Sequence, residues 1–400
     1  MSIVRDLSVS AVTAGLVTVL VGFASAAVIV FQAAGAVGAP PAQVGSWMLA
    51  LGLGMCLTSV GLSLRYRVPV VTAWSTPGAA LLVTSAAGLT IEEATGVFLV
   101  SALLVTVSGF SGWFERVMDR IPVALASGML AGVLLRFGLG LFTSMGSRFT
   151  LAFSMFCAYA LARRLSPRYA VIAALAIGVV IALVQGLLHL DAVRLALARP
   201  IWVTPRFSPP ALVGVAIPLF VVTMASQNVP GVAVIRASGY TVPISPLVGW
   251  TGLANLVLAP IGGFTLNLAA ITAAICMGRE AHEDPARRYV AAVAAGVFYA
   301  VVGLFGATVV ALLAAFPPEL VAAIAGLALL ATIGNGLAAA LGPENQREAA
   351  LVTFLVTASG VTVAGVGSAF WGLVAGGLTL MIGRGTVGSG TIRRAAGGRG

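Results

Sequence analysis

Long apolar runs follow one another along almost the whole chain, and this repetition constrains the fold more than any other feature. Charged residues make up 8% of the 400 residues and apolar residues 60%, which excludes an ordinary soluble domain. A helix needs about 20 apolar residues to cross the hydrocarbon core of a membrane. The sequence therefore predicts an all-α polytopic membrane protein with fourteen spans, at 8–34, 44–64, 69–88, 93–114, 122–145, 149–163, 169–190, 210–235, 245–260, 264–279, 286–316, 319–340, 348–365 and 367–384.

The basic residues support this count and predict an orientation. All 22 of them are arginine, and the formal net charge is +10. A basic balance is compatible with nucleic-acid binding, but arginines gather in the cytoplasmic loops of membrane proteins. With a cytoplasmic N-terminus, most arginines fall at cytoplasmic ends of the predicted spans, for example Arg65, Arg67, Arg163, Arg164 and Arg287. We therefore expect a multi-pass protein of the cell inner (plasma) membrane, embedded in lipid, with both termini cytoplasmic and no nucleic-acid partner.

The predicted span 69–88 does not look like a continuous helix. It begins with Pro69 and β-branched residues, which favour an extended chain. The sequence Ser75-Thr76-Pro77-Gly78 follows, and Ser or Thr before Pro is typical of a helix start, because the hydroxyl caps a free N–H. The rise per residue of each form places this helix start close to the middle of the bilayer. Open backbone at that depth is tolerated only where protein buries it or where it lines a cavity.

A second stretch, 260–278, resembles the first, with glycines, a cap candidate and then an apolar helix. Counting seven residues on from Pro69 gives Thr76, and the same count from Pro260 gives Asn267; both are good N-cap residues. These broken segments are the third and tenth of the fourteen. They predict 7+7 inverted repeats, with half-helices and short extended stretches in segments 3 and 10 around a transport site.

The two helix starts predict a site for a small anion. Each presents unsatisfied N–H groups and about half a positive charge, which suits a carboxylate. The expected donors beside them are Ser75, Thr76, Thr265 and Asn267, with Leu266 between the last two. The alternative is that these side chains only cap their helices.

Aromatic residues stand beside these donors. Trp74, Phe264 and, on the first span, Phe23 are candidates for the walls of a pocket that takes a flat apolar ring. Aromatic residues in a helical bundle more often serve packing alone, so that alternative stays open for each of them.

Two adjacent amides, Gln227 and Asn228, lie within the eighth span. Amides are costly in lipid unless they face a partner or a wet cavity. They are therefore expected either to hold substrate or to satisfy broken backbone. Ser25 joins the candidate set because Ala24-Ser25 on the first span resembles Ala225-Ser226 on the eighth.

Acidic residues are absent from the interior of every predicted span. All twelve aspartates and glutamates lie at span ends or in loops, and both histidines lie outside the span interiors. A buried metal centre or an acid–base cluster therefore has nothing to be built from. The sequence predicts no enzymatic activity, no metal and no cofactor.

Four stretches together resemble the benzoate/proton symporter (BenE) family, which is related to the uracil/nucleobase permeases and the sulfate/anion carriers. They are RDLSVSAVTAG, RYRVPVVTAWSTPGAALL, SQNVPGVAVIRASGY and GGFTLNLAAITAAI, and the likeness covers nearly the whole chain. The resemblance implies fourteen spans, a site between spans three and ten, and often a homodimer. It also implies a core domain in 1–121 and 210–318 and a gate domain in 122–209 and 319–385, followed by a cytoplasmic tail in 386–400.

The same resemblance places Gln227 where nucleobase permeases have a glutamate, and Asn267 or its neighbour where they have a second acid. Both acids are missing here, which fits an anionic substrate, because a buried carboxylate would repel it. Proton coupling would then use a carboxylate at a span end, such as Glu319 or Glu344, or none.

These observations predict a secondary active transporter that imports benzoate or a related aromatic carboxylate together with a proton. The core domain is expected to move against the gate domain in alternating access. The alternatives are transport of another small anion or a nucleobase on the same fold, or an anion channel.

Overall fold

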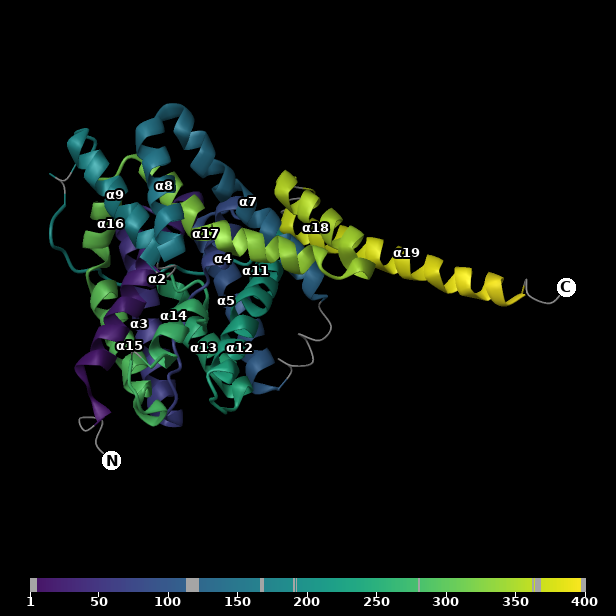
Figure 1. The fold of residues 1–400 in the computed structure, drawn as a ribbon, viewed down its shortest axis with the longest axis horizontal. Coiled ribbons are helices and arrows are strands. Elements are labelled where there is room, and N and C mark those ends of the chain that lie inside the picture. Colours follow the sequence, from purple (N-terminus) through teal and green to yellow (C-terminus); the bar gives the residue numbers. More distant parts are fainter. Residues whose placement is uncertain are drawn as a thin grey trace.

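The described residues of the computed structural model form a bundle of helices around a short two-stranded ribbon (Figure 1). They are residues 6–112, 122–165, 169–189, 191, 193–279, 281–361, 363 and 368–396, without the side chains of residues 24, 25, 233, 237 and 383–396. The first elements are α2 (Val9–Ala36), α3 (Pro41–Tyr66), β1 (Thr72–Trp74), α4 (Thr76–Ser85), α5 (Ile91–Phe110), α7 (Val123–Ser147), α8 (Phe149–Leu165) and α9 (Ala170–Val184). The later elements are α10 (Pro209–Ala211), η3 (Leu212–Ala216), α11 (Ile217–Thr223), η4 (Met224–Asn228), α12 (Val229–Ala237), α13 (Ile244–Leu258), η5 (Ala259–Ile261), β2 (Leu266–Leu268), α14 (Ile271–Met277), η6 (Pro285–Arg287), α15 (Tyr289–Leu304), α16 (Gly306–Ala314), α17 (Pro318–Leu341), η7 (Glu344–Gln346), α18 (Arg347–Ser359) and α19 (Ser368–Ala396).

Several of these helices can cross a membrane. Seven of the helices in the described part are long and apolar enough, and α2, whose two parts are bent by 43°, makes an eighth if it counts as one span. The chain is therefore a multi-pass membrane protein. Other elements that coincide with predicted spans are shorter, such as α8, α9 and α18, so the count of fourteen stays a prediction.

A break at Phe305 divides the long predicted span 286–316 into two helices. The helix α15 ends at Leu304 and α16 begins one residue after Phe305. Glycines flank this break, and an added Cβ at Gly303 would lie 3.0 Å from the Cα of Gly52 in α3. The break therefore falls where the backbone packs too closely on α3 to carry side chains.

Neighbouring helices pack along their lengths, α15 on α3, α13 on α5, α17 on α7 and α18 on α19. Small residues allow close approach at these contacts. A Cβ added to Gly128 of α7 would lie 2.6 Å from the carbonyl oxygen of Ala350 in α18. One added to Gly252 of α13 would lie 2.6 Å from the backbone nitrogen of Thr106 in α5. The glycine-rich composition of the spans thus serves helix packing.

The two broken segments cross each other as an antiparallel ribbon. The strands β1 and β2 pair in the register Thr72–Leu268, Ala73–Asn267 and Trp74–Leu266. The pairing continues beyond the strands, since the N–H of Ser75 donates to the carbonyl of Thr265 (3.0 Å) and the N–H of Ala269 to that of Val71 (2.9 Å). Each segment thus satisfies open backbone of the other, as an extended chain within a membrane requires. Both predicted extended stretches are present, and each leads into a helix, α4 or α14.

Wide, π-helical turns interrupt the segment from α10 to α12. The turn η3 ends just before Ile217 and Pro218, and η4 ends just before Val229 and Pro230. A proline has no N–H to return to the preceding turn, so the helix widens ahead of it and then resumes. The second wide turn contains both adjacent amides of this segment.

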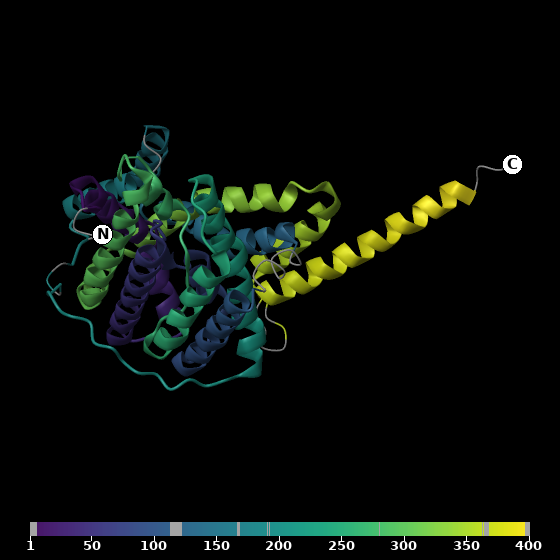
Figure 2. The ribbon, with the colours of Figure 1, turned by 90° about the horizontal axis from the view of Figure 1, so that it is seen from below.

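An extended segment, residues 193–208, runs across the ends of several helices (Figure 2). The N–H of Ala198 donates to the carbonyl of Leu304 (2.8 Å), and the N–H of Arg206 donates to that of Glu92 (2.9 Å). The segment therefore ties the end of α15 to the start of α5. The helix α19 projects well beyond the remaining helices (Figures 1 and 2).

Candidate functional site

A cavity of about 470 Å³ lies beside the crossing of the two broken segments. Part of its wall comes from α2, from η4 and α12, and from the starts of α4 and α14. The rest comes mainly from α7 and α17. A concave space of this size, reached by several elements, is the usual form of a small-molecule site.

The cavity wall is mostly apolar, with neutral polar groups at a few points. Its polar side chains are those of Thr76, Ser127, Ser226, Gln227, Thr272, Tyr299, Thr332 and Asn335. None of the described lining residues is charged. Any anion bound here would therefore be held by dipoles and hydrogen-bond donors rather than by an ion pair.

The start of α4 reaches the cavity with its first residue. Ser75 is fully buried and caps the helix: its Oγ accepts hydrogen bonds from the N–H of Gly78 (3.0 Å) and the hydroxyl of Thr223 (3.2 Å). Thr76 lines the cavity, and Pro77 has no N–H to offer. The N–H of Thr76 is thus the first-turn donor that has no acceptor within α4.

The prediction that Asn267 caps the second helix is wrong. Asn267 lies in the middle of β2, and α14 begins only at Ile271, with no capping side chain before it. The cause is the turn that follows Pro260, in which Gly262 has a φ of +104°, a conformation that glycine adopts readily. This turn lies between Pro260 and β2. Both β2 and α14 therefore begin later in the chain than the count of residues from Pro260 predicts.

The two adjacent amides face different ways. Gln227 is half-buried and lines the cavity, whereas Asn228 is fully buried. The Oδ1 of Asn228 accepts from the N–H of Leu268 (2.9 Å), and its Nδ2 contacts the sulfur of Met224 (3.2 Å). Asn267, also fully buried, donates from Nδ2 to the carbonyl of Leu268 (2.9 Å) and lies 3.5 Å from the Oε1 of Gln227. Gln227 is therefore the amide that a ligand in the cavity would meet.

One of the three predicted aromatic residues, Trp74, lines the cavity. Phe23 lies behind it, with ring centroids 4.8 Å apart in an edge-on arrangement. Phe264 is fully buried elsewhere, 6.1 Å from the ring of Trp47 and 6.2 Å from that of Phe98. Phe264 thus belongs to a packing cluster, and Trp74 provides the aromatic surface at the cavity.

The remaining predicted site residues whose side chains are described lie off the cavity wall. Thr265 and Leu266 are buried, and Leu266 packs against Gly54 of α3. The hydroxyl of Thr265 has no hydrogen-bond partner in the described part of the chain. The side chain of Ser25 lies outside the described residues. The structure therefore brings Trp74, Thr76 and Gln227 together on one cavity and places the other candidates whose side chains it describes off the cavity wall.

Several polar residues of the wall are not among those predicted from the sequence. They are Ser127 of α7, Thr332 and Asn335 of α17, Thr272 near the start of α14, and Tyr299 of α15. A signal for Asn335 was available, because it is an amide within the apolar run 319–340. The serine and threonines gave no such signal, since hydroxyl side chains in membrane helices often bond to their own backbone.

The described carboxylates lie near helix ends and not at the cavity. Glu319 lies 3.6 Å from Arg148, and Glu344 lies 4.0 Å from Arg347. Within the described ranges, no group of three or more His, Cys, Asp or Glu side chains is placed to hold a metal ion.

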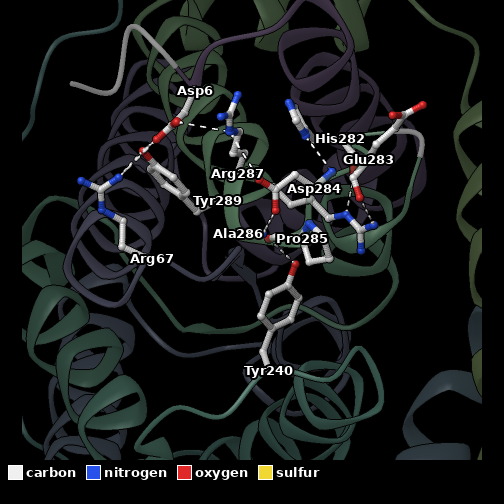
Figure 3. A network of polar contacts seen from close by, with 11 residues as sticks. Asp6, Arg67, Tyr240, His282, Glu283, Asp284, Pro285, Ala286, Arg287 and Tyr289 are labelled. Carbon is white, nitrogen blue, oxygen red and sulfur yellow. Dashed lines mark hydrogen bonds and ion pairs between the residues drawn. The ribbon is translucent and has the colours of Figure 1, made fainter. Parts of the chain in front are cut away.

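Asp6 is a buried acid held at one end of the bundle by groups from several elements (Figure 3). Its Oδ2 accepts from the hydroxyl of Tyr289 (2.7 Å) and from Nη1 of Arg67 (3.3 Å), and its Oδ1 lies 3.7 Å from Nε of Arg287. The network fastens the start of α2 to the end of α3 and the start of α15. None of these four residues lines the cavity.

Comparison with known proteins assigns the family. The family model of the benzoate membrane transport protein (BenE) matches residues 5–382. The chain belongs to this family. It is therefore a membrane transporter and not an enzyme, and the family implies a small anionic substrate.

Two relatives of this BenE-family chain match along nearly their whole length. The inner membrane protein YdcO of Escherichia coli (strain K12) is 52% identical over 369 residues, which are 92% of this chain and 94% of that protein. The benzoate membrane transport protein of Acinetobacter baylyi is 39% identical over 378 residues, which are 94% of this chain and 96% of that protein.

Solved structures share the fold. The transmembrane domain of the cyanobacterium bicarbonate transporter BicA has a TM-score of 0.59 at 12% identity, covering 93% of this chain and 97% of that one. SLC26A9 has a TM-score of 0.64 at 13% identity, covering 96% of this chain and 67% of that one. At such low identity the likeness concerns the polytopic helical fold alone.

Proposed function

We propose that this BenE-family transporter imports benzoate or a related small aromatic carboxylate, together with a proton, across the cell inner membrane. The observation that carries the proposal is the cavity beside the crossed strands, whose wall combines neutral donors with apolar and aromatic surface. The family and the printed name of the 39% identical relative support benzoate as the substrate.

The carboxylate is assigned to the side of the cavity formed by η4 and the start of α4. Gln227 supplies amide N–H groups there, and Thr76 supplies a hydroxyl and the free N–H of the first helical turn. The positive end of a helix dipole contributes about 0.3–1 kcal/mol to an anion, and up to about 2 kcal/mol in a partly buried site. Binding without a fixed cation stays moderate, which suits a carrier because the substrate must also leave.

The aromatic ring is assigned to the apolar part of the wall. Trp74 offers an indole face, and Val21, Met55 and Ala126 line the same cavity. Aromatic rings pack favourably on such surfaces, with a contribution of about 0.5–1.5 kcal/mol beyond burial. The ring thus distinguishes an aromatic carboxylate from a small inorganic anion.

The proposed architecture has fourteen segments in two inverted repeats of seven, with a core domain in 1–121 and 210–318 and a gate domain in 122–209 and 319–385. The cavity fits this division, because its wall joins α2, η4, α4 and α14 from the former ranges to α7 and α17 from the latter. Alternating access would move one set against the other. In the strand pairing, Ala73 lies opposite Asn267. A two-fold axis through this pair relates residues at equal distances along the two segments, so the counterpart of Thr76 in the second repeat is Ala270 and not Asn267.

The proposal also places both termini in the cytoplasm. It further includes a homodimer as the assembly. The arginine distribution supports that orientation. Since no described lining residue is acidic, a proton would be carried by a carboxylate at a helix end, with Glu319 and Glu344 as candidates.

Uptake of labelled benzoate into proteoliposomes tests the proposal. We expect saturable uptake that an inward proton gradient stimulates and that unlabelled benzoate, but not sulfate or uracil, inhibits. Preloaded benzoate should drive counterflow, which a channel does not support. Absence of benzoate uptake would remove the substrate assignment, and uptake that ignores the gradient would remove proton coupling alone.

A further inference from the structure

The orientation of the Asn267 amide is set by a backbone group. Its Nδ2 donates to the carbonyl oxygen of Leu268 at 2.9 Å. A carbonyl oxygen can only accept, so the NH₂ end of Asn267 must face it. The N–H of Leu268 in turn donates to the Oδ1 of Asn228 at 2.9 Å, so hydrogen bonds hold this residue at both its N–H and its carbonyl.

The orientation of the Gln227 amide follows from that of Asn267. The Nδ2 of Asn267 also lies 3.5 Å from the Oε1 of Gln227, so the carbonyl end of Gln227 is turned toward a donor. Gln227 lines the cavity, and its Nε2 has no hydrogen-bond partner in the described part of the chain. The NH₂ end is thereby left for a ligand.

We infer that Asn267 is a positioning residue, which holds the Gln227 side chain with its NH₂ group toward the cavity and so makes the site select an acceptor-only carboxylate. This inference rests on the proposed function and changes the role of Asn267, from a substrate donor to a group that acts through Gln227. Asn267 is fully buried and does not line the cavity, which excludes direct contact with a ligand held there.

The unpaired oxygen of Asn267 is a second observation that supports this role. Its Oδ1 is buried and has no hydrogen-bond partner within the described residues. Leaving a buried acceptor unsatisfied is unfavourable, and native proteins do so rarely. The orientation that gives Nδ2 its acceptors, the Leu268 carbonyl and the Oε1 of Gln227, thus leaves the Oδ1 of Asn267 unpaired.

The preference of the site for benzoate over benzamide reports on the orientation of the Gln227 amide. The two ligands have the same ring and nearly the same shape. Benzoate carries only acceptors, whereas benzamide presents both a donor and an acceptor. A Gln227 amide locked with its NH₂ outward favours benzoate, and an amide free to turn over accepts benzamide as well.

A double-mutant cycle on the purified full chain tests the inference, with dissociation constants measured for both ligands. The variants are Asn267→Leu, Asn267→Asp, Gln227→Leu and the two combinations. Asn267→Leu should lower the preference for benzoate over benzamide about tenfold, the size of one hydrogen bond to a charged group. Asn267→Asp in its ionised form should lower it further, since a carboxylate offers Gln227 only acceptors and turns the carbonyl of Gln227 toward the cavity.

In the Gln227→Leu background, Asn267→Leu should leave the preference unchanged within about twofold, because the residue it acts through is gone. In the same background, Asn267→Asp acts only through the repulsion between its charge and benzoate, and this effect is subtracted from the one measured with Gln227 present. Because Asp has nearly the same shape as Asn, this variant provides the test if Asn267→Leu does not fold. An equal loss of both ligands, or an effect that persists without Gln227, would overturn the positioning role. If the unsubstituted protein binds no benzoate, the proposed function fails and the inference fails with it.

Discussion

Replacing Gln227 by glutamate tests the idea that this site binds an anion through neutral groups. The substitution keeps the shape of the side chain and its contact with Asn267, because a carboxylate oxygen also accepts from Nδ2. It exchanges the NH₂ group at the cavity for a charged oxygen. The affinity for a carboxylate should therefore fall without a loss of folded protein.

The size of the effect follows from the surroundings of Gln227. No described residue of the cavity wall carries a charge that could offset the new carboxylate. Two unit charges about 4 Å apart interact by about 4 kcal/mol at an effective dielectric constant of about 20. The dissociation constant for benzoate should thus rise roughly thousandfold when both groups are ionised.

Equilibrium binding of labelled benzoate over a pH series provides the assay. Binding to the Gln227→Glu variant should recover as the pH falls, because protonation of the introduced carboxyl removes the repulsion. Benzamide binding should change far less. Gln185→Glu is the matched control, since Gln185 is exposed at the end of α9 and does not line the cavity. A benzoate affinity that stays within about threefold of the unsubstituted protein would refute the reasoning.

Two further substitutions test the framework around the site, both by thermal unfolding in detergent. Ser75→Ala removes the cap on the N–H of Gly78 and should lower stability by about 1 kcal/mol; an unchanged melting temperature would contradict this. Gly231→Ala places a Cβ 2.7 Å from the Cβ of Leu268 and should cost about 1–3 kcal/mol through overpacking of α12 on β2. Its control is Gly35→Ala, which meets nothing within 4 Å and should be neutral or stabilising, and equal effects of the two changes would count against the close approach.

The sequence was sufficient for the membrane class, for most helix positions and for the two broken segments. Proline, β-branched residues and a Ser-Thr-Pro-Gly helix start are local signals, and the segment from Thr72 to Ser85 follows them closely. The second segment shows the limit of such counting. The strand β1 begins at Thr72, soon after Pro69, whereas a glycine-dependent turn separates Pro260 from β2.

The site was predictable only in part because a side chain's surroundings depend on tertiary packing. Trp74, Thr76 and Gln227 line the cavity. Phe264 was an equally good aromatic candidate by type and position, yet it packs on Trp47 and Phe98. Apart from the amide of Asn335, the contributions of α7 and α17 could not be foreseen, since nothing else local in those helices says which face meets the crossed strands.

A structure of the protein with benzoate bound would test the central claim most directly. The account predicts benzoate in the cavity beside the crossed strands, with its ring against Trp74. The carboxylate should lie within about 3 Å of the Nε2 of Gln227 and of a donor of Thr76. Benzoate bound outside this cavity, or inside it with its carboxylate turned away from both residues, would contradict the account.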